Sequence, residues 1–171
     1  MKNGKVTTFL VDDDEMYLEM LTDKIKLNPR LRLKTFSNGE DCINNLSENP
    51  EIVILDYKLN KDNSDAKNGI EILRKIKQAK PNIEVIILSS QEKIEIAVET
   101  IKQGAYTYVV KNETAFERLR IVIHNILHKF HLQRSNKLYR KQRVYLVIAL
   151  VIVLLVNVLN YLFNPDAFKL W

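Results

Sequence analysis

Five short runs of almost continuous apolar residues recur along the first part of the chain, separated by more polar segments. Runs without polar alternation are typical of strands buried on both faces, which is the pattern of a parallel sheet. The second run differs, because Arg32 and Lys34 alternate with its apolar residues, and this indicates a strand at the sheet edge. The expected strands are 6–11, 31–36, 52–55, 83–88 and 106–110.

The segments between these runs carry apolar residues at helical spacing. The alternation of five strands with helices predicts an α/β fold, a doubly wound sandwich around a five-stranded parallel sheet. Asp14 precedes the first helical segment and is well placed to cap it. The expected helices are 15–27, 39–46, 69–79, 92–103 and one that begins at Ala115.

Polar side chains stand where four of the expected strands end. Three aspartates at 12–14 follow the first strand, Asp56 follows the third, and Ser89 and Lys111 follow the fourth and fifth. The carboxyl ends of parallel strands line one crevice, so groups that are far apart in sequence converge there on a ligand. We therefore expect one site built from these residues.

The residue types at these four positions indicate magnesium and phosphoryl chemistry. Mg²⁺ takes oxygen ligands and binds through one or two carboxylates plus a phosphoryl group, which Asp12, Asp13 and Asp56 suit. A carboxylate can also be a nucleophile that forms an aspartyl phosphate. In that reaction Asp56 is the expected nucleophile, Lys111 the counter-charge and Ser89 the hydrogen-bond donor. Each residue alone has an ordinary explanation as a helix cap or a solvated side chain, but this does not explain why they coincide.

On these residues the chain resembles the receiver domain of two-component response regulators. The resemblance covers roughly residues 5–127, a size range normal for one domain. It rests on four segments in a specific order and spacing: FLVDDD at 9–14, IVILD at 52–56, IILSS at 86–90 and GAYTYVVK at 104–111. It implies a flavodoxin-like fold and a phosphoacceptor rather than a turnover enzyme.

The resemblance also implies roles for individual residues. For partners it implies a histidine kinase or a phosphotransfer protein as the donor of the phosphoryl group and, since the family often dimerises in this way, a homodimer through the fourth helix, fifth strand and fifth helix. The implied residues are Asp12, Asp13, Asp56 and the backbone carbonyl of Lys58 for Mg²⁺, Asp56 for phosphorylation, Ser89 and Lys111 for the phosphoryl group, and Tyr108 as the aromatic switch.

Three features depart from the family pattern. The loop after Asp56 usually meets a proline and a nearby glycine, whereas here eleven residues, 58–68, precede Gly69. Asn112 stands where the family usually has a proline in a cis bond after the lysine. Ser89 replaces the more frequent threonine and keeps the hydroxyl group.

Charge divides the chain more sharply than its net value of +5 indicates. Residues 1–127 hold 19 basic and 20 acidic residues, whereas 128–143 hold six basic residues and no acidic one. Residues 144–163 carry no charge, and about 20 helical residues at about 1.5 Å each cross a hydrocarbon core of about 30 Å. We expect a receiver domain at 1–127, a basic juxtamembrane linker at 128–143, a transmembrane helix at 144–163 and a short extracytoplasmic tail at 164–171. The alternative, a buried helix of a globular fold, lacks a packing partner.

The basic linker also predicts topology and partners. Basic residues flanking a span stay in the cytoplasm, so we expect a single-pass protein of the bacterial cytoplasmic membrane with its receiver inside and its C-terminus outside. The linker would also contact anionic lipids of the bilayer. The N-terminus has no apolar segment of the kind that forms a signal peptide, so no signal peptide is expected. The linker is too short for a DNA-binding domain, so no direct nucleic-acid binding is expected.

Two other functions are compatible with parts of the sequence. The 12–14 segment resembles the nucleophile motif of haloacid-dehalogenase-type phosphatases, but the glycine-threonine turn and later paired aspartates of that family are not seen. A receiver-shaped scaffold at the membrane that works without phosphorylation would be indicated by a missing acid or lysine. Asp56 and Lys111 are both present, which favours the phosphoacceptor.

Overall fold

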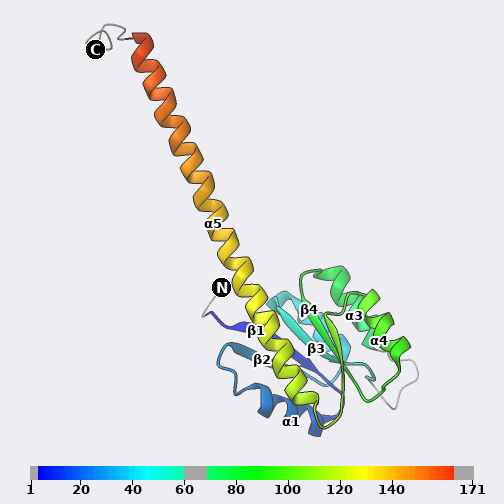
Figure 1. Ribbon diagram of the computed structural model, residues 1–171. Coiled ribbons are helices and arrows are strands. Elements are labelled where there is room, and N and C mark those ends of the chain that lie inside the picture. The colour runs from blue at the N-terminus through cyan, green and yellow to red at the C-terminus, as the bar shows by residue number, and fades with distance from the viewer. Residues whose placement is uncertain (1–3, 60–68, 164–171) are drawn as a thin grey trace. The chain divides into compact units, whose positions relative to one another are not determined.

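A computed structural model describes residues 4–59 and 69–163 and divides the chain into two units, Met1–Ile126 and Leu127–Trp171. The first unit alternates strands and helices around one sheet (Figure 1). The strands are β1 (Val6–Val11), β2 (Leu31–Phe36), β3 (Ile52–Asp56), β4 (Glu84–Ser89) and β5 (Thr107–Val110). The helices are α1 (Glu15–Ile25), α2 (Gly39–Asn44), α3 (Gly69–Ala79), α4 (Ile94–Lys102) and α5 (Ala115–Phe163), with a 3-10 turn η1 (Leu46–Glu48).

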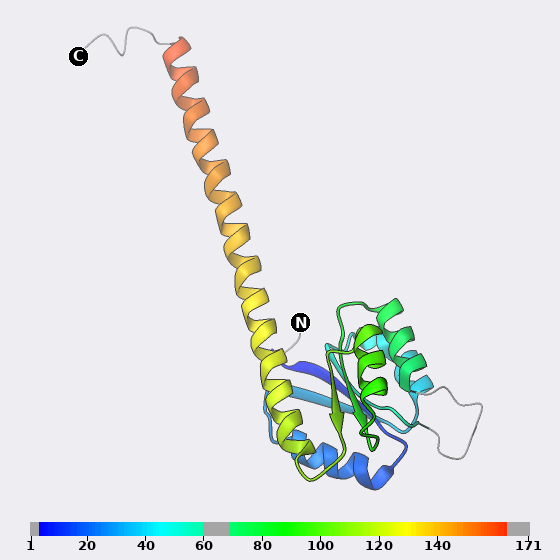
Figure 2. The same cartoon turned by 45° about the vertical axis from the view of Figure 1, so that its right-hand side comes forward.

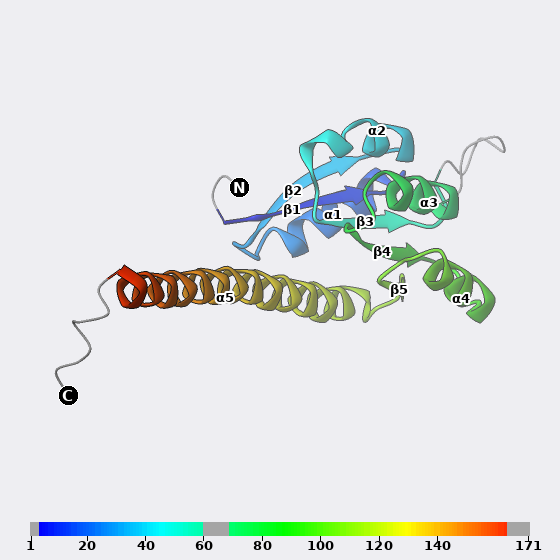
Figure 3. The same ribbon diagram turned by 90° about the horizontal axis from the view of Figure 1, so that it is seen from above.

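The sheet has the order β2-β1-β3-β4-β5, and all of its neighbours pair in parallel. The expected five-stranded parallel sheet is therefore confirmed, with the polar-alternating β2 at one edge. In Figure 3, α2 and α3 lie on one face of the sheet and α1 on the other. Crossovers of this kind leave the carboxyl ends of β1, β3, β4 and β5 at the same end of the sheet. No helix is needed to cover this end, because the helices pack on the two faces of the sheet.

The core explains why the central strands are apolar at every position. All five residues of β3 are buried, because each face of this strand is covered by helices. On one face Val53 and Leu55 belong to a cluster with Ile72 and Ile76 of α3. On the opposite face of the strand Ile54 is also fully buried. Burial of such side chains supplies the main favourable free energy of folding.

Three helices differ at their ends from the sequence prediction. Helix α1 stops at Ile25 rather than 27, and Lys26 caps it by donating its backbone N–H to the carbonyl of Thr22. The predicted helix 39–46 ends at Asn44 and tightens into η1. Helix α4 begins at Ile94 instead of 92, because the carbonyl of Gln91 accepts a hydrogen bond from the Tyr108 hydroxyl.

Helix α5 starts at Ala115 as predicted, and its first part is a core helix. Leu119, Ile123 and Ile126 are buried in the first unit. In the second unit, Gln142–Leu159 is apolar and long enough to cross a membrane, and none of its side chains is buried. The expected tail at 164–171 lies outside the described residues.

A buried and an exposed isoleucine allow a direct test of this core. We expect Ile54→Ala to lower the free energy of unfolding by about 2–5 kcal/mol, because it leaves a cavity in the middle of the sheet. Ile121→Ala is the matched control, since that side chain on α5 is 57% exposed and its loss should cost under about 0.5 kcal/mol. Urea denaturation followed by tyrosine fluorescence measures both. Equal effects would contradict the assigned core.

Candidate functional site

The register of the sheet brings the predicted site residues to one edge. Parallel pairing of β1 with β3 places Asp12, the residue after β1, beside Asp56, the last residue of β3. Across the sheet, the backbone N–H of Lys111 donates to the carbonyl of Ser89 over 2.7 Å, which joins the ends of β4 and β5. The structure therefore gathers the four predicted strand-end positions in one place.

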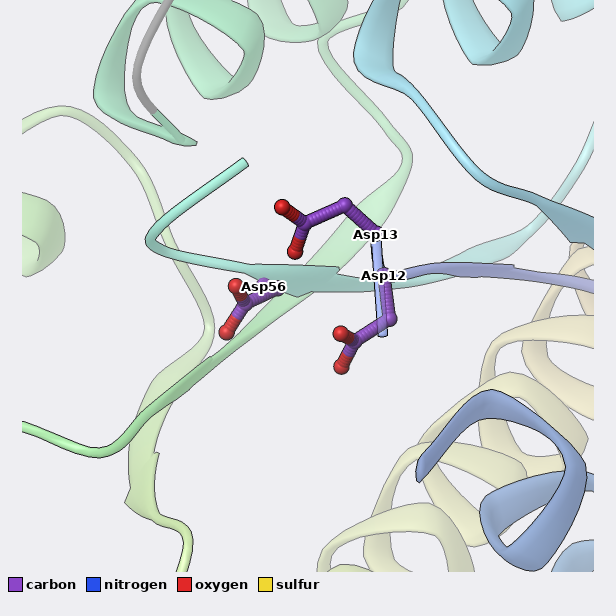
Figure 4. Close-up of side chains that lie close together, drawn as sticks. All are labelled: Asp12, Asp13 and Asp56. Carbon is purple, nitrogen blue, oxygen red and sulfur yellow. The ribbon is translucent and has the colours of Figure 1, made fainter. Parts of the chain in front are cut away.

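Three carboxylates form the centre of this edge. Asp12, Asp13 and Asp56 each have a carboxylate oxygen within 4.8 Å of those of the other two, and Figure 4 shows them at the ends of neighbouring strands. Asp12 and Asp56 are nearly inaccessible, with 1% and 2% of their surface exposed. An all-oxygen donor set of this kind suits a hard cation such as Mg²⁺.

Lys111 bridges the two buried acids. Its Nζ lies 2.7 Å from Asp12 Oδ2 and 2.8 Å from Asp56 Oδ1. The other carboxylate oxygens accept backbone hydrogen bonds: Asp12 Oδ1 from the N–H of Asp14, and Asp56 Oδ2 from the N–H of Lys58, both over 3.1 Å. Each buried acid is thus fixed by the ammonium group on one side and by the backbone on the other.

The charges of the site are not balanced. Burial raises the pKa of Asp56 to about 6, although Lys111 opposes the shift. Burial also raises the pKa of Asp12 against the influence of Lys111. For Lys111, burial works to lower the pKa, but Asp56 and Asp12 outweigh it and the pKa is raised. The attraction of one ammonium group is therefore smaller than the free-energy cost of removing the acids from water. A further cation would stabilise the charged forms of the acids.

Ser89 and Tyr108 form a second part of the site. Ser89 is fully buried, and its Oγ accepts a hydrogen bond from the N–H of Gln91 over 3.0 Å. The Tyr108 hydroxyl donates to the carbonyl of Gln91 over 2.6 Å. Burial raises the pKa of Tyr108, and a hydrogen bond with Ser89 opposes this rise. Tyr108 is therefore tied to the turn that carries the Ser89 hydroxyl group.

Two neighbouring residues have structural roles. The Asp14 side chain accepts a hydrogen bond from the N–H of Tyr17 over 3.0 Å and caps α1, as predicted. Gly69 lies against the end of β3, where a Cβ atom would be 2.6 Å from the Asp56 carbonyl oxygen and 2.7 Å from Tyr57 Cα. Only glycine fits this close approach. Residues 60–68 of the long loop lie outside the described residues.

Sequence reasoning missed two contributors, Tyr17 and Gln91. The Tyr17 ring lies under Lys111 Nζ at 4.3 Å from the ring centroid. In the contacts that the structure describes, Gln91 contributes backbone groups, which any residue except proline could supply. The neighbouring sequence indicates neither contribution. Tyr17 has the pattern of an ordinary residue in the first turn of a helix.

Comparison with known protein families gives a match over most of the first unit. The model of the family described as "Response regulator receiver domain" matches residues 8–124. A putative response regulator, NtrX-like, from Rickettsia felis is 36% identical over 112 residues, which are 63% of this chain and 22% of that protein. A protein-glutamate methylesterase/protein-glutamine glutaminase from Clostridium acetobutylicum is 29% identical over 117 residues, 66% of this chain and 32% of that protein. The chain spans about a third or less of the length of these curated relatives.

A solved structure agrees with these matches. The BeF3-activated DrrB receiver domain is 31% identical and superposes with a TM-score of 0.63. The match covers 72% of this chain and 98% of that domain. The sheet and its helices therefore correspond to a single domain of known architecture.

The raised pKa of Asp56 predicts a defined pH dependence of stability. In metal-free buffer, Asp56 keeps its proton in the folded state up to about pH 6, whereas in the unfolded state it loses the proton near its ordinary pKa of 3.8. The contribution to stability is therefore complete below pH 3.8 and is lost as pH rises through about 6. We expect Asp56→Asn to remove this fall, which is at most a few kcal/mol.

Urea denaturation at several pH values, in the presence of a chelator, measures this effect. Asp23→Asn is the control, because that side chain is 60% exposed and lies outside the cluster. It should keep the pH dependence of the wild type. An Asp56→Asn protein with the same dependence as the wild type would contradict the raised pKa.

Proposed function

The chain belongs to the response regulator receiver domain family, and from this premise we propose that it accepts a phosphoryl group on Asp56 and signals through protein contacts. Domains of this family are generally phosphoacceptors rather than turnover enzymes. The observation that carries the proposal is the convergence of Asp12, Asp56 and Lys111 within hydrogen-bonding distance at one sheet edge. Family membership gives no support to the haloacid-dehalogenase-type phosphatase.

Receiver domains bind Mg²⁺ through an acidic pocket. In this chain Asp12, Asp13 and Asp56 would hold the ion, with the backbone carbonyl of Lys58 as a further ligand. Its three carboxylates fit, since their oxygens lie within 4.8 Å of one another. A bound Mg²⁺ supplies positive charge that stabilises the transferring phosphoryl group. It would also relieve the electrostatic cost of the buried acids.

The transfer itself needs a nucleophile and groups that receive the developing charge. A carboxylate oxygen of Asp56 forms the new bond to phosphorus, while the bond between phosphorus and an imidazole nitrogen of the donor breaks and that nitrogen keeps the electron pair. The donor is a histidine kinase or a phosphotransfer protein. The Lys111 ammonium group, which lies 2.8 Å from Asp56 Oδ1, would direct its N–H donors to the phosphoryl oxygens from that place, and the Ser89 hydroxyl would donate a hydrogen bond to them.

The signal would leave the site through Tyr108. This side chain is hydrogen-bonded to the turn after Ser89, so a phosphoryl group on Asp56 that takes a hydrogen bond from the Ser89 hydroxyl would change the surroundings of the ring. The face formed by α4, β5 and α5 offers exposed apolar side chains next to it, with Ile94 75% and Ile101 47% exposed. A homodimer through this face would bury them and couple phosphorylation to assembly.

The second unit would anchor the protein in the bacterial cytoplasmic membrane. Gln142–Leu159 has the length and apolar character of a span. The basic segment 128–143 would hold the receiver on the cytoplasmic side, with the C-terminus outside, and contact anionic lipid headgroups. Tethering keeps the receiver near a membrane-bound kinase and raises its effective concentration.

The phosphoacceptor role is tested by the mass of the intact chain in a mild detergent. After incubation with acetyl phosphate and Mg²⁺, we expect one phosphoryl adduct that disappears in Asp56→Asn and falls strongly when Mg²⁺ is chelated. Asp14→Asn is the matched control, because this neighbouring acid caps α1 and asparagine caps equally well. Its adduct should equal that of the wild type. An adduct that survives in Asp56→Asn would place the phosphoryl group on another residue and refute Asp56 as the acceptor, whereas the lack of any adduct would favour the phosphorylation-independent scaffold.

The anchor is tested by the resistance of the chain to alkaline extraction from bacterial membranes. We expect the wild type to stay in the membrane pellet and the double variant Val151→Arg, Leu154→Arg to be released. Each arginine near the bilayer centre costs about 2.5–3.5 kcal/mol. The control is Val151→Ala, Leu154→Ala, which keeps an apolar span and should stay in the pellet. Release of the wild type by the same wash would refute the span.

A further inference from the structure

Lys111 is held on a third side by an aromatic ring. Two carboxylates bind its ammonium group, and the ring of Tyr17 lies under the same nitrogen at 4.3 Å from the centroid. A cation over a ring face at this distance is attracted by the negative face of the ring. The Lys111 side chain is only 14% exposed, and this attraction is stronger where water is largely excluded.

The ring of Tyr17 is fixed in turn from two directions. The Asp14 side chain accepts a hydrogen bond from its backbone N–H over 3.0 Å, which sets the first turn of α1. Phe116 stacks against the ring, with 6.0 Å between centroids and planes inclined by 22°. Phe116 lies at the start of α5, five residues after Lys111. The ring therefore joins α1 to both ends of the turn that carries the lysine.

The hydroxyl group of Tyr17 does not account for the contribution of a tyrosine at this position. Its oxygen is buried and has no hydrogen-bond partner among the described residues. A buried polar atom without a partner costs free energy. The contribution of the side chain at this position is therefore its ring, which phenylalanine would supply without that cost.

The residue after Lys111 does not supply an equivalent restraint. The Lys111–Asn112 peptide bond is trans. The Asn112 side chain turns towards the start of α5, where its oxygen accepts hydrogen bonds from the backbone and hydroxyl groups of Thr114 over 3.1 and 2.9 Å. The direction of the Lys111 side chain is thus set by the groups that contact this side chain, which are the two carboxylates and the Tyr17 ring.

We propose that Tyr17 is a positioning residue that holds the Lys111 ammonium group between its ring and the carboxylates of Asp12 and Asp56. The inference rests on the proposed function, because it assigns to the ring the orientation of the lysine that pairs with the phosphoryl oxygens when Asp56 accepts the group. A lysine oriented in advance stabilises the transferring group without having to be ordered during the reaction. Tyr17 acts through Lys111 and does not touch the phosphoryl group.

The test compares Tyr17→Phe with Tyr17→Leu in the full chain in a mild detergent. The first readout is the NMR NOE between the Lys111 ε protons and the β protons of Asp12 and Asp56, which reports the place of the ammonium group and does not depend on a ring current. The second is the rate of phosphoryl adduct formation from acetyl phosphate at a fixed Mg²⁺ concentration. We expect Tyr17→Phe to keep these NOEs and a rate within about twofold of the wild type, and Tyr17→Leu to weaken the NOEs and react about three- to tenfold more slowly.

Two results would overturn the inference. One is a Tyr17→Leu protein with unchanged Lys111 NOEs and rate, and the other is a Tyr17→Phe protein as impaired as Tyr17→Leu, which would assign the effect to the hydroxyl group. Unchanged backbone amide signals of β3 in both variants show that the sheet is intact. If the wild type forms no adduct, the proposed function fails, whereas weaker NOEs between Lys111 and the two carboxylate side chains in Tyr17→Leu alone still support the positioning role.

Discussion

The burial of two carboxylates beside a single ammonium group is the constraint on which this receiver depends. Asp12 and Asp56 lose almost all their water, and among the residues that the structure describes Lys111 is the one side chain that pairs with both. An arrangement of this kind costs free energy by itself. It persists because the strands that end at these residues are the most apolar part of the sheet, and their burial offsets the cost.

The same constraint explains why the site responds to what enters it. Lys111 is shared between two acids, so a group that draws the ammonium away changes the surroundings of both at once. Burial raises the pKa of Asp56 to about 6, so this carboxyl gains a proton readily in the absence of further positive charge. In the proposed function the cation and the phosphoryl group would therefore support each other's binding, since each would compensate a charge that the other leaves exposed.

The sequence was sufficient for the parts of the fold that depend on local pattern. Continuous apolar runs predict the strands. The rule that parallel strands end at one crevice predicts that Asp56, Ser89 and Lys111 lie close together. Helix ends were less certain, as at Ile94, because the deciding contact comes from β5. The Tyr17 ring was missed for a similar reason. Its neighbours Lys111 and Phe116 are distant in sequence. The position of an aromatic residue on an amphipathic helix does not indicate which cation contacts it in the fold.

Gly69 has a consequence for how the region after Asp56 can vary. Its N–H donates to the carbonyl of Tyr57 over 2.8 Å, and the N–H of Tyr57 donates to the Leu88 carbonyl over 2.7 Å. These bonds fasten both ends of the intervening stretch to the sheet. The entropy cost of closing a loop rises only slowly with its length. Evolution can therefore lengthen or shorten the chain between these two anchor points at little thermodynamic cost, while the Asp56 carboxylate stays at the end of its strand.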